Sequence, residues 1–177
     1  MRLFVAIPIP EDVRRRLVSI SAGVRNARWV RPEGMHITLF FVGETDRESA
    51  RDLDAELEDV RLPAFEVQCK GLGYFERGSN IKSVWAGIES NPTLLFLQDR
   101  VEAAAVRAGF PRENRKFKPH VTLARLKHGR AEDVGPWIEA HDSLQLPPFT
   151  VDRFVLFRSH LAREGAMYEP LVDYLLN

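Results

Sequence analysis

The segment MHITLFFVG (residues 35–43) has a near copy in PHVTLARL (residues 119–126). Both contain the pattern His-aliphatic-Thr-Leu, which begins at His36 in the first and at His120 in the second. Polar and aliphatic residues that alternate in this way are typical of a β-strand with one buried face, because successive side chains of a strand point to opposite sides. The sequence therefore predicts two strands, each with a histidine and a threonine on one face and aliphatic anchors on the other.

The segments around these strands predict an α+β fold. Several strand patterns follow one another without an intervening helix, which indicates antiparallel pairing. Because the two histidine strands fall at similar places in two halves of the chain, we expect one pseudo-symmetric, two-lobed domain over residues 1–177 with a cleft between the lobes. Further strands are expected at 2–10, 64–71, 82–88, 149–159 and 167–176, and helices at 11–24, 45–60, 91–109 and 131–141.

Two of the expected helices have clear start signals. Asn91 precedes Pro92, a pair typical of a helix N-cap and first position, and Gly109 is suited to close the same helix. In the second case Thr45 stands three residues before Glu48, the spacing of a capping box. These signals predict where the two helices begin.

The composition is that of an ordinary globular protein, with 45% hydrophobic and 28% charged residues and a net charge of zero. No apolar run is long enough to span a membrane, and the segment MRLFVAIPIP lacks the features of a signal peptide. The only cysteine, Cys69, excludes an internal disulfide and is expected to be buried in a strand. We therefore expect a cytoplasmic protein that does not bind a membrane.

The charge is unevenly distributed along the chain. Residues 44–59 contain eight acidic and two basic residues, whereas residues 112–130 contain seven basic residues and one acidic residue. The basic segment surrounds the second histidine motif. A positive field at that place suits an anionic partner such as a phosphate.

Two histidines and two threonines on facing strands are suited to phosphoryl chemistry. Histidine titrates near neutral pH, so one ring can accept a proton while the other donates one. The hydroxyls of Thr38 and Thr122 can donate hydrogen bonds to phosphate oxygens, and Arg125 can hold the phosphate. Strict alternation places Arg125 on the face opposite His120, so the strand must end or bulge before Arg125.

Other chemistries find less support in the sequence. Two histidines could bind zinc, but neither motif contains a cysteine, aspartate or glutamate at ligand spacing. The chain also lacks a nucleophile-elbow sequence, a P-loop and a glycine-rich dinucleotide fingerprint. We therefore expect no metal and no cofactor.

The paired motifs and their flanks resemble the 2H phosphoesterase family. The resemblance is greatest to its RNA 2′,3′-cyclic phosphodiesterase branch, historically called 2′-5′ RNA ligase, and runs along nearly the whole chain. It is carried by RLFVAI, WVRPEGMHITLFFVGE, LGYF, VWAGIE, FKPHVTLAR, VDRFVLFRSHL and YEPL.

This resemblance implies a bilobal fold in which two antiparallel sheets line a central cleft, with helices on the outer faces. It implies hydrolysis of RNA 2′,3′-cyclic phosphate ends to 2′-phosphates without a metal. His36 corresponds to the proton donor and His120 to the base that activates water. Thr38, Thr122 and Arg125 correspond to the residues that bind the phosphate.

Several points stay open at the level of sequence. Phe4 either stacks on a base or belongs to the core. Members of the family also join RNA ends through 2′-5′ linkages, and the substrate can be a tRNA fragment, another RNA end or a small cyclic nucleotide. A non-catalytic module that binds RNA ends is the alternative to an enzyme. We expect a monomer.

Overall fold

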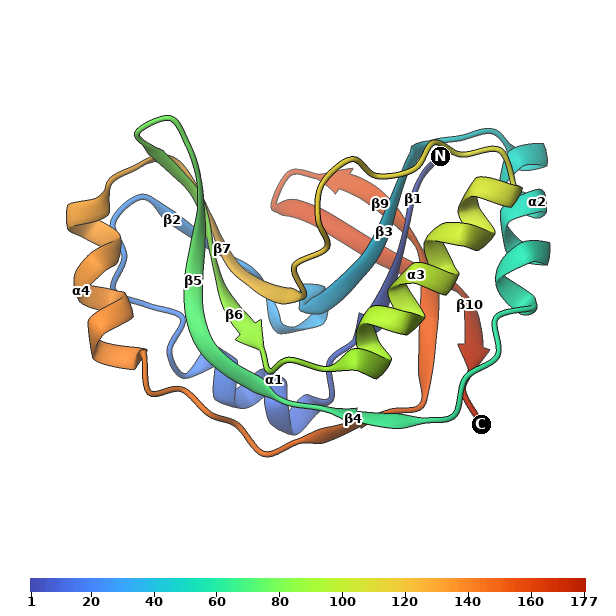
Figure 1. The fold of residues 1–177 in the computed structure, drawn as a ribbon. Coiled ribbons are helices and arrows are strands. Elements are labelled where there is room, and N and C mark those ends of the chain that lie inside the picture. The colour runs from blue at the N-terminus through green and yellow to red at the C-terminus, as the bar shows by residue number, and fades with distance from the viewer.

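The computed structural model describes residues 1–177 and contains four α-helices, a short 3₁₀ helix and ten strands (Figure 1). The helices are α1 (Glu11–Val18), α2 (Arg47–Glu58), α3 (Pro92–Arg107) and α4 (Ala131–His141), with η1 at Pro32–Gly34. The strands are β1 (Arg2–Pro8), β2 (Ala27–Trp29), β3 (His36–Glu44), β4 (Phe65–Val67), β5 (Cys69–Arg77), β6 (Asn80–Ile88), β7 (His120–Gly129), β8 (Phe149–Val151), β9 (Arg153–Ala162) and β10 (Gly165–Leu175).

Eight of the strands form two antiparallel sheets of four that meet along one edge. The first half has the order β10-β9-β1-β3, and the second half has the order β7-β6-β5. Strand β2 pairs with β7 along the same edge that meets β3, opposite the edge that pairs with β6. A single residue pair, Ile37 with Val121, joins β3 to β7. The two halves are therefore connected as one sheet, but only at this one pair. Figure 1 shows the two halves inclined to each other. The predicted α+β fold with two antiparallel sheets is confirmed.

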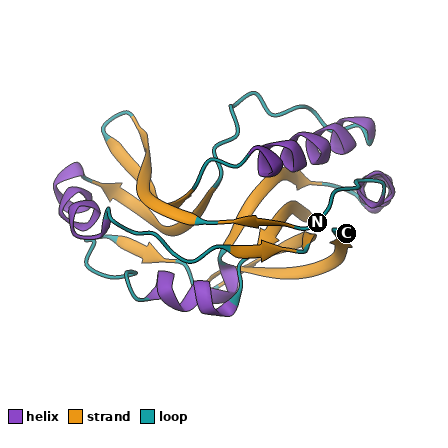
Figure 2. Cartoon of the chain, turned by 60° about the horizontal axis from the view of Figure 1, so that its bottom comes forward, coloured by secondary structure: helices purple, strands orange, loops and turns teal.

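The helices lie around the outside of the strands, as Figure 2 shows. Helix α3 contacts β3 and α2, and α2 also contacts β10, so both helices lie against the first half. Helix α4 contacts β5 and β6 of the second half. No helix of the protein is both long enough and apolar enough to cross a membrane.

The start of α3 agrees with its sequence signals, whereas that of α2 does not. The Asn91 side chain accepts a hydrogen bond from the backbone N–H of Leu94 at 3.0 Å, and Gly109 follows the helix with a φ of +99°. In α2 the N-cap is Asp46, whose carboxylate accepts a hydrogen bond from the Ser49 N–H at 2.8 Å. The expected capping box at Thr45 is therefore wrong by one residue, because the neighbouring carboxylate competes successfully for the same role.

Two segments that read as single strands are each divided. The segment at 64–71 breaks at Gln68 into β4 and β5, and the segment at 149–159 breaks at Asp152 into β8 and β9. Strands β4 and β8 pair with each other in a small separate sheet. At each break the chain leaves this small sheet and enters one of the two large halves. The breaks depend on pairing between distant segments, so the local sequence does not indicate them.

Candidate active site

The two histidine motifs have the same pattern of burial in the structure. In residues 36–41 and again in residues 120–125, the first and third positions are half-buried, the second, fourth and fifth are buried, and the sixth is exposed. Ile37 and Val121, the second positions, belong to the hydrophobic core. The prediction that each histidine shares a face with its threonine is confirmed, since the intervening aliphatic residue points into the core.

The register between β3 and β7 brings the two motifs together. Ile37 lies opposite Val121 in an antiparallel pair. One step in either direction sets His36 towards Thr122 and Thr38 towards His120, all on the face opposite the core. In a regular ladder these pairs lie directly opposite each other, which makes His36 and His120 diagonal neighbours about 7–8 Å apart.

Each motif contains a β-bulge at its leucine. In the pairing of β1 with β3, Val5 lies opposite Phe40 and Ala6 opposite Thr38, so Leu39 is the extra residue. The pairing of β6 with β7 leaves out Leu123 in the same way. A bulge shifts the alternation by one residue.

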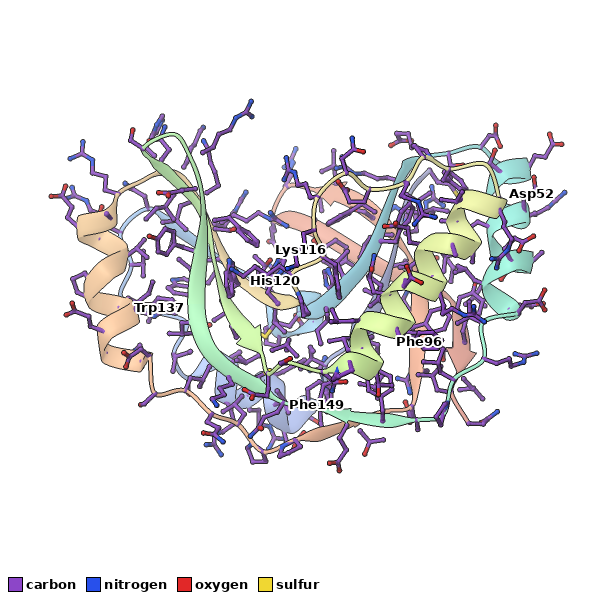
Figure 3. All side chains as sticks on the ribbon, viewed as in Figure 1. Asp52, Phe96, Lys116, His120, Trp137 and Phe149 are labelled. Atoms are coloured by element: carbon purple, nitrogen blue, oxygen red, sulfur yellow. The ribbon has the colours of Figure 1, made fainter.

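The bulge at Leu123 therefore turns Arg125 to the same side as His120 and Thr122. The bulge expected from the position of Arg125 is thus confirmed. The name histidine face is used below for the side of the sheet that carries His36, Thr38, His120, Thr122 and Arg125. Figure 3 shows His120 in the central region between the two halves.

Each imidazole is held by a carbonyl oxygen two residues earlier in its own chain segment. The Nδ1 atom of His36 lies 2.8 Å from the carbonyl oxygen of Gly34, and that of His120 lies 2.6 Å from the carbonyl oxygen of Lys118. A carbonyl oxygen can only accept a hydrogen bond, so Nδ1 carries the proton in both rings. In the neutral state the free acceptor is therefore Nε2 of each histidine.

Aromatic rings surround both histidines. The ring of His36 lies 4.9 Å from that of Phe4 and 5.2 Å from that of Tyr168, measured between centroids. The ring of His120 lies 4.9 Å from Phe75 and 5.6 Å from Trp85. Apolar surroundings of this kind disfavour the charged imidazolium.

The electrostatic environment lowers the pKa of both histidines. The pKa of His36 is lowered to about 4, chiefly by burial, and the positive charges of Arg125 and His120 act in the same direction. The pKa of His120 is also lowered, first by burial and then by the charges of Arg125 and Lys118. Arg125 thus acts on both rings, which fits a guanidinium near the junction of the two halves.

Phe4 is buried, with only 4% of its surface exposed, although it lies on the side of His36. Its ring stacks on Phe157 at 5.2 Å and meets the edge of Tyr168 at 5.0 Å. Phe41, its partner across β1 and β3, is 64% exposed. Tyr168 and Phe157, which contact His36, are half-buried, so the most exposed ring of this aromatic group is that of Phe41 next to Phe4.

The carbonyl groups of the two bulged leucines accept hydrogen bonds from donors that lie outside the strand pairs β1–β3 and β6–β7. The carbonyl of Leu123 accepts a hydrogen bond from the backbone N–H of Val30 at 2.8 Å. Beyond the pair Ile37–Val121 no strand continues along this edge of β3, and the side-chain amide of Gln98 on α3 donates to the carbonyl of Leu39 at 3.3 Å. Gln98 thus replaces a missing strand neighbour.

Gln98 also belongs to a polar chain that reaches the basic loop before β7. Its amide donates to Glu102 at 3.4 Å, and Arg112 donates to the other carboxylate oxygen of Glu102 at 2.9 Å. Glu102 is only 9% exposed and is the one charged residue that is buried in the protein. These hydrogen bonds therefore connect the bulge of the first motif to the loop that leads to His120.

Three residues beside the histidines were not singled out as site residues from the sequence. These are Phe75, Trp85 and Tyr168, which lie in the segments LGYF, VWAGIE and YEPL that carry the family resemblance. Those segments therefore mark the surroundings of the two imidazoles. No group of three or more histidine, cysteine, aspartate or glutamate side chains is arranged to hold a metal ion.

Comparisons with known proteins agree with this geometry. The profile of the 2′-5′ RNA ligase superfamily matches residues 10–163. The RNA 2′,3′-cyclic phosphodiesterase of Thermotoga maritima is 33% identical over 181 residues, covering 98% of this chain and 94% of the relative. That of Escherichia coli K12 is 29% identical over 185 residues, covering 99% and 96%.

Solved structures show the same fold. A Thermus thermophilus protein, TT0787, superposes with a TM-score of 0.81 at 29% identity, covering 99% of this chain and 97% of that one. The E. coli protein LigT, solved in complex with 3′-AMP, gives a TM-score of 0.79 at 27% identity with the same coverage. The chain therefore belongs to the 2′-5′ RNA ligase superfamily.

Proposed function

We propose that the protein hydrolyses the 2′,3′-cyclic phosphate at the end of an RNA to a 2′-phosphate, by acid-base catalysis between His36 and His120. The observation that carries the proposal is that both imidazole rings are held in the same way, by a hydrogen bond from Nδ1 to a backbone carbonyl oxygen. This leaves both Nε2 atoms free on one face beside Arg125. The names of the curated relatives, RNA 2′,3′-cyclic phosphodiesterase, support the substrate class.

The reaction needs one neutral and one protonated histidine. Nε2 of neutral His120 accepts a proton from water as the water oxygen attacks the phosphorus. The bond from phosphorus to the 3′ oxygen breaks, and Nε2–H of His36 gives its proton to that oxygen. The product carries a 2′-phosphate and a 3′-hydroxyl, and exchange with solvent returns both rings to their starting states.

The remaining residues of the histidine face bind the phosphate. Thr38 and Thr122 flank the two imidazoles, and their hydroxyls donate to the non-bridging oxygens. The guanidinium of Arg125 neutralises the charge that grows on those oxygens in the transition state. These roles are assigned from position and from the family resemblance.

The low pKa of His36 sets a requirement on the bound state. At a pKa of about 4 the ring is almost wholly neutral at pH 7, and a neutral ring whose Nε2 lacks a proton cannot protonate the leaving oxygen. An anionic phosphate between the two rings favours the imidazolium and raises both pKa values. Substrate binding thus recruits the proton that His36 later donates.

The terminal base is expected to rest on the aromatic surface of the first half. Phe41 presents an exposed ring there, and stacking on an exposed ring accepts any base. Phe4, the residue proposed from the sequence, lies beside Phe41 with the ring centroids 6.3 Å apart, and it stays a prediction as a direct partner of the base.

The RNA class and cellular setting are proposed from the same chemistry. RNA fragments with cyclic phosphate ends, tRNA fragments among them, are the expected substrates, and the protein is expected to act as a monomer without a cofactor. A cytoplasmic location is expected from the sequence, and the buried, unpaired Cys69 is compatible with it.

The test is incubation of the purified protein with an oligonucleotide that ends in a 2′,3′-cyclic phosphate, in the presence of EDTA. We expect conversion to a 2′-phosphate. A 3′-phosphate product would mean that the 2′ oxygen leaves. Loss of turnover on chelation, restored by zinc or manganese, would favour a metal-dependent hydrolase.

The same assay separates the two alternatives. Binding of the oligonucleotide without turnover would indicate a non-catalytic module for RNA ends. Turnover of nucleoside 2′,3′-cyclic phosphates with no gain for the oligonucleotide would indicate a phosphodiesterase for small cyclic nucleotides.

A further inference from the structure

Arg28, at the centre of β2, lies directly opposite Arg125 in the pairing of β2 with β7. Directly opposed residues of an antiparallel pair point to the same face, with Cβ atoms about 4.5–5.5 Å apart. Both side chains are exposed. Arg28 therefore shares the histidine face with Arg125, along the edge of β7 that also meets β3.

A third cation continues this group along β7. After the bulge, Ala124 and Leu126 point into the core. Lys127 alternates with them and is exposed, so it lies on the histidine face next to Arg125. Arg28, Arg125 and Lys127 are called the arginine corner below.

The arginine corner has no acidic partner. None of the ion pairs within 4.0 Å in the protein includes Arg28, Arg125 or Lys127. Like charges placed directly opposite each other destabilise a sheet. The chain has as many acidic as basic residues, yet it leaves this repulsion uncompensated. Such an arrangement is suited to an anion that comes from outside the protein.

The first half has no equivalent of this corner. Phe41 takes the position of Arg125, as the sixth residue of its motif. Beyond Ile37 no strand pairs with the edge of β3 that corresponds to the β2 edge of β7, and α3 contacts β3 there through Gln98. The anion-binding surface therefore extends from the reacting phosphate in one direction only, into the second half.

We propose that Arg28 and Lys127 form a second phosphate site, which binds the phosphodiester on the 5′ side of the terminal nucleotide. The inference rests on the proposed function, because that function places the cyclic phosphate at Arg125. The next anion along an RNA that ends there is this phosphodiester. The arginine fork matches phosphate oxygens, and the side chains of Arg28 and Lys127 are both exposed beside Arg125.

The experiment compares two substrates that differ by one phosphate. Uridine 2′,3′-cyclic phosphate offers the reacting phosphate alone, whereas the dinucleotide UpU with a 2′,3′-cyclic phosphate end adds the phosphodiester. We expect Arg28→Gln and Lys127→Gln to raise the KM for the dinucleotide about tenfold more than the KM for the mononucleotide, a difference of about 1.4 kcal/mol. Equal changes for the two substrates, or no change, would overturn the inference.

A matched control is Arg16→Gln on α1, another exposed arginine without an acidic partner. It should leave the ratio of the two KM values at its wild-type value. If the wild-type protein turns over neither substrate, the proposed function fails. If it turns over both with the same KM and Arg28→Gln changes nothing, only the second site fails.

Salt dependence and thermal unfolding give two independent measurements. A lost phosphate contact should reduce the slope of log KM against log salt by about 0.7 for the dinucleotide. In buffer without phosphate, Arg28→Gln should not lower Tm, because it relieves the repulsion with Arg125. Inorganic pyrophosphate should raise the Tm of the wild type more than that of the variant. A lower Tm and an unchanged salt slope would contradict the second site.

Discussion

Phe41 and Arg125 occupy equivalent positions in the two halves of the protein. Each is the sixth residue of its motif, each follows a bulge at a leucine, and each is exposed on the side of its histidine. The backbone is repeated, but the chemistry is not, since one position carries an aromatic ring and the other a cation. We expect this difference to give the site a direction, because a cation attracts a phosphate and an exposed ring can stack on a base.

Arg125→Met should reduce kcat/KM for a cyclic-phosphate RNA end about 100- to 1,000-fold, the usual cost of losing one donor to a developing oxyanion. Phe41→Leu, at the equivalent position, should raise KM less than about tenfold and leave kcat near the wild-type value. Steady-state kinetics of the two variants test this. An equal loss of kcat in both variants would mean that the side chain at the sixth position maintains the local backbone structure, and that the charge of Arg125 is not what matters.

His36→Ala and His120→Ala should each reduce kcat about 100- to 10,000-fold, because each removes one proton transfer. The double variant should be little slower than either single variant, since the two rings act as a unit. Binding of a non-hydrolysable RNA end should survive in all three. Near wild-type turnover by His36→Ala would refute the two-histidine mechanism.

The dependence of kcat/KM on pH should be bell-shaped with an optimum below pH 6.5. The active form of the free protein carries one proton on the pair, and burial lowers the pKa of both rings, that of His36 to about 4. On the acid side kcat/KM falls because the pair binds a second proton, and on the alkaline side it falls because the pair loses its only proton. Both apparent pKa values belong to the coupled pair and not to single residues. The profile of kcat should lie at higher pH, because bound phosphate raises both pKa values. An optimum for kcat/KM above pH 7 would contradict the inferred environment.

Acid should destabilise the protein in part through His36. Its pKa is about 4 in the folded protein and about 6.5 in an unfolded chain, so the unfolded chain binds a proton more readily between these values. The contribution is complete above pH 6.5 and is lost as the pH falls towards 4, at most about 3 kcal/mol in all. Urea unfolding at pH 7 and pH 4.5 should show a smaller loss for His36→Gln than for the wild type. An identical loss would mean that His36 is not shielded from solvent.

Gln98→Leu should lower kcat about tenfold, because the bulge at Leu39 loses the donor that holds its carbonyl group. Gln68→Leu is a matched control, since the amide of Gln68 also donates to a leucine carbonyl, that of Leu146 at 2.8 Å, but away from the histidines. Both variants should lose similar free energy of unfolding, about 1 kcal/mol. A fall in kcat for both variants would show that the loss of activity results from reduced stability and not from the lost hydrogen bond at the bulge.

The features that the sequence predicts well are those encoded within a few residues. The alternation of the motifs places His36 and Thr38 on one face. The position of Arg125 predicts that its strand ends or bulges before it, because in a regular strand Arg125 would point to the face opposite His120. The cap of α3 is likewise local, in Asn91 and Pro92.

The features that the sequence does not predict depend on contacts between distant segments. Gln98 and Leu39 are 59 residues apart, and only the packing of α3 against β3 brings the amide to the bulge. The divided strands at Gln68 and Asp152 follow from pairing in a third, small sheet. The facing arginines Arg28 and Arg125 depend on the pairing of β2 with β7, which no pattern in the three residues of β2 specifies.

The strand order also determines when the sheet around each of the two histidines can be completed during synthesis of the chain. The second half is complete once residue 129 has emerged, since β2, β5, β6 and β7 are all made by then. The first half must wait for β9 and β10, because β1 pairs with β9 through contacts such as Ala6 with Val155. Contacts between such distant residues are slow to form. A nascent chain released after α4 would therefore carry His120 on a finished sheet and His36 on an unfinished one, so that catalysis begins only when the last two strands have left the ribosome.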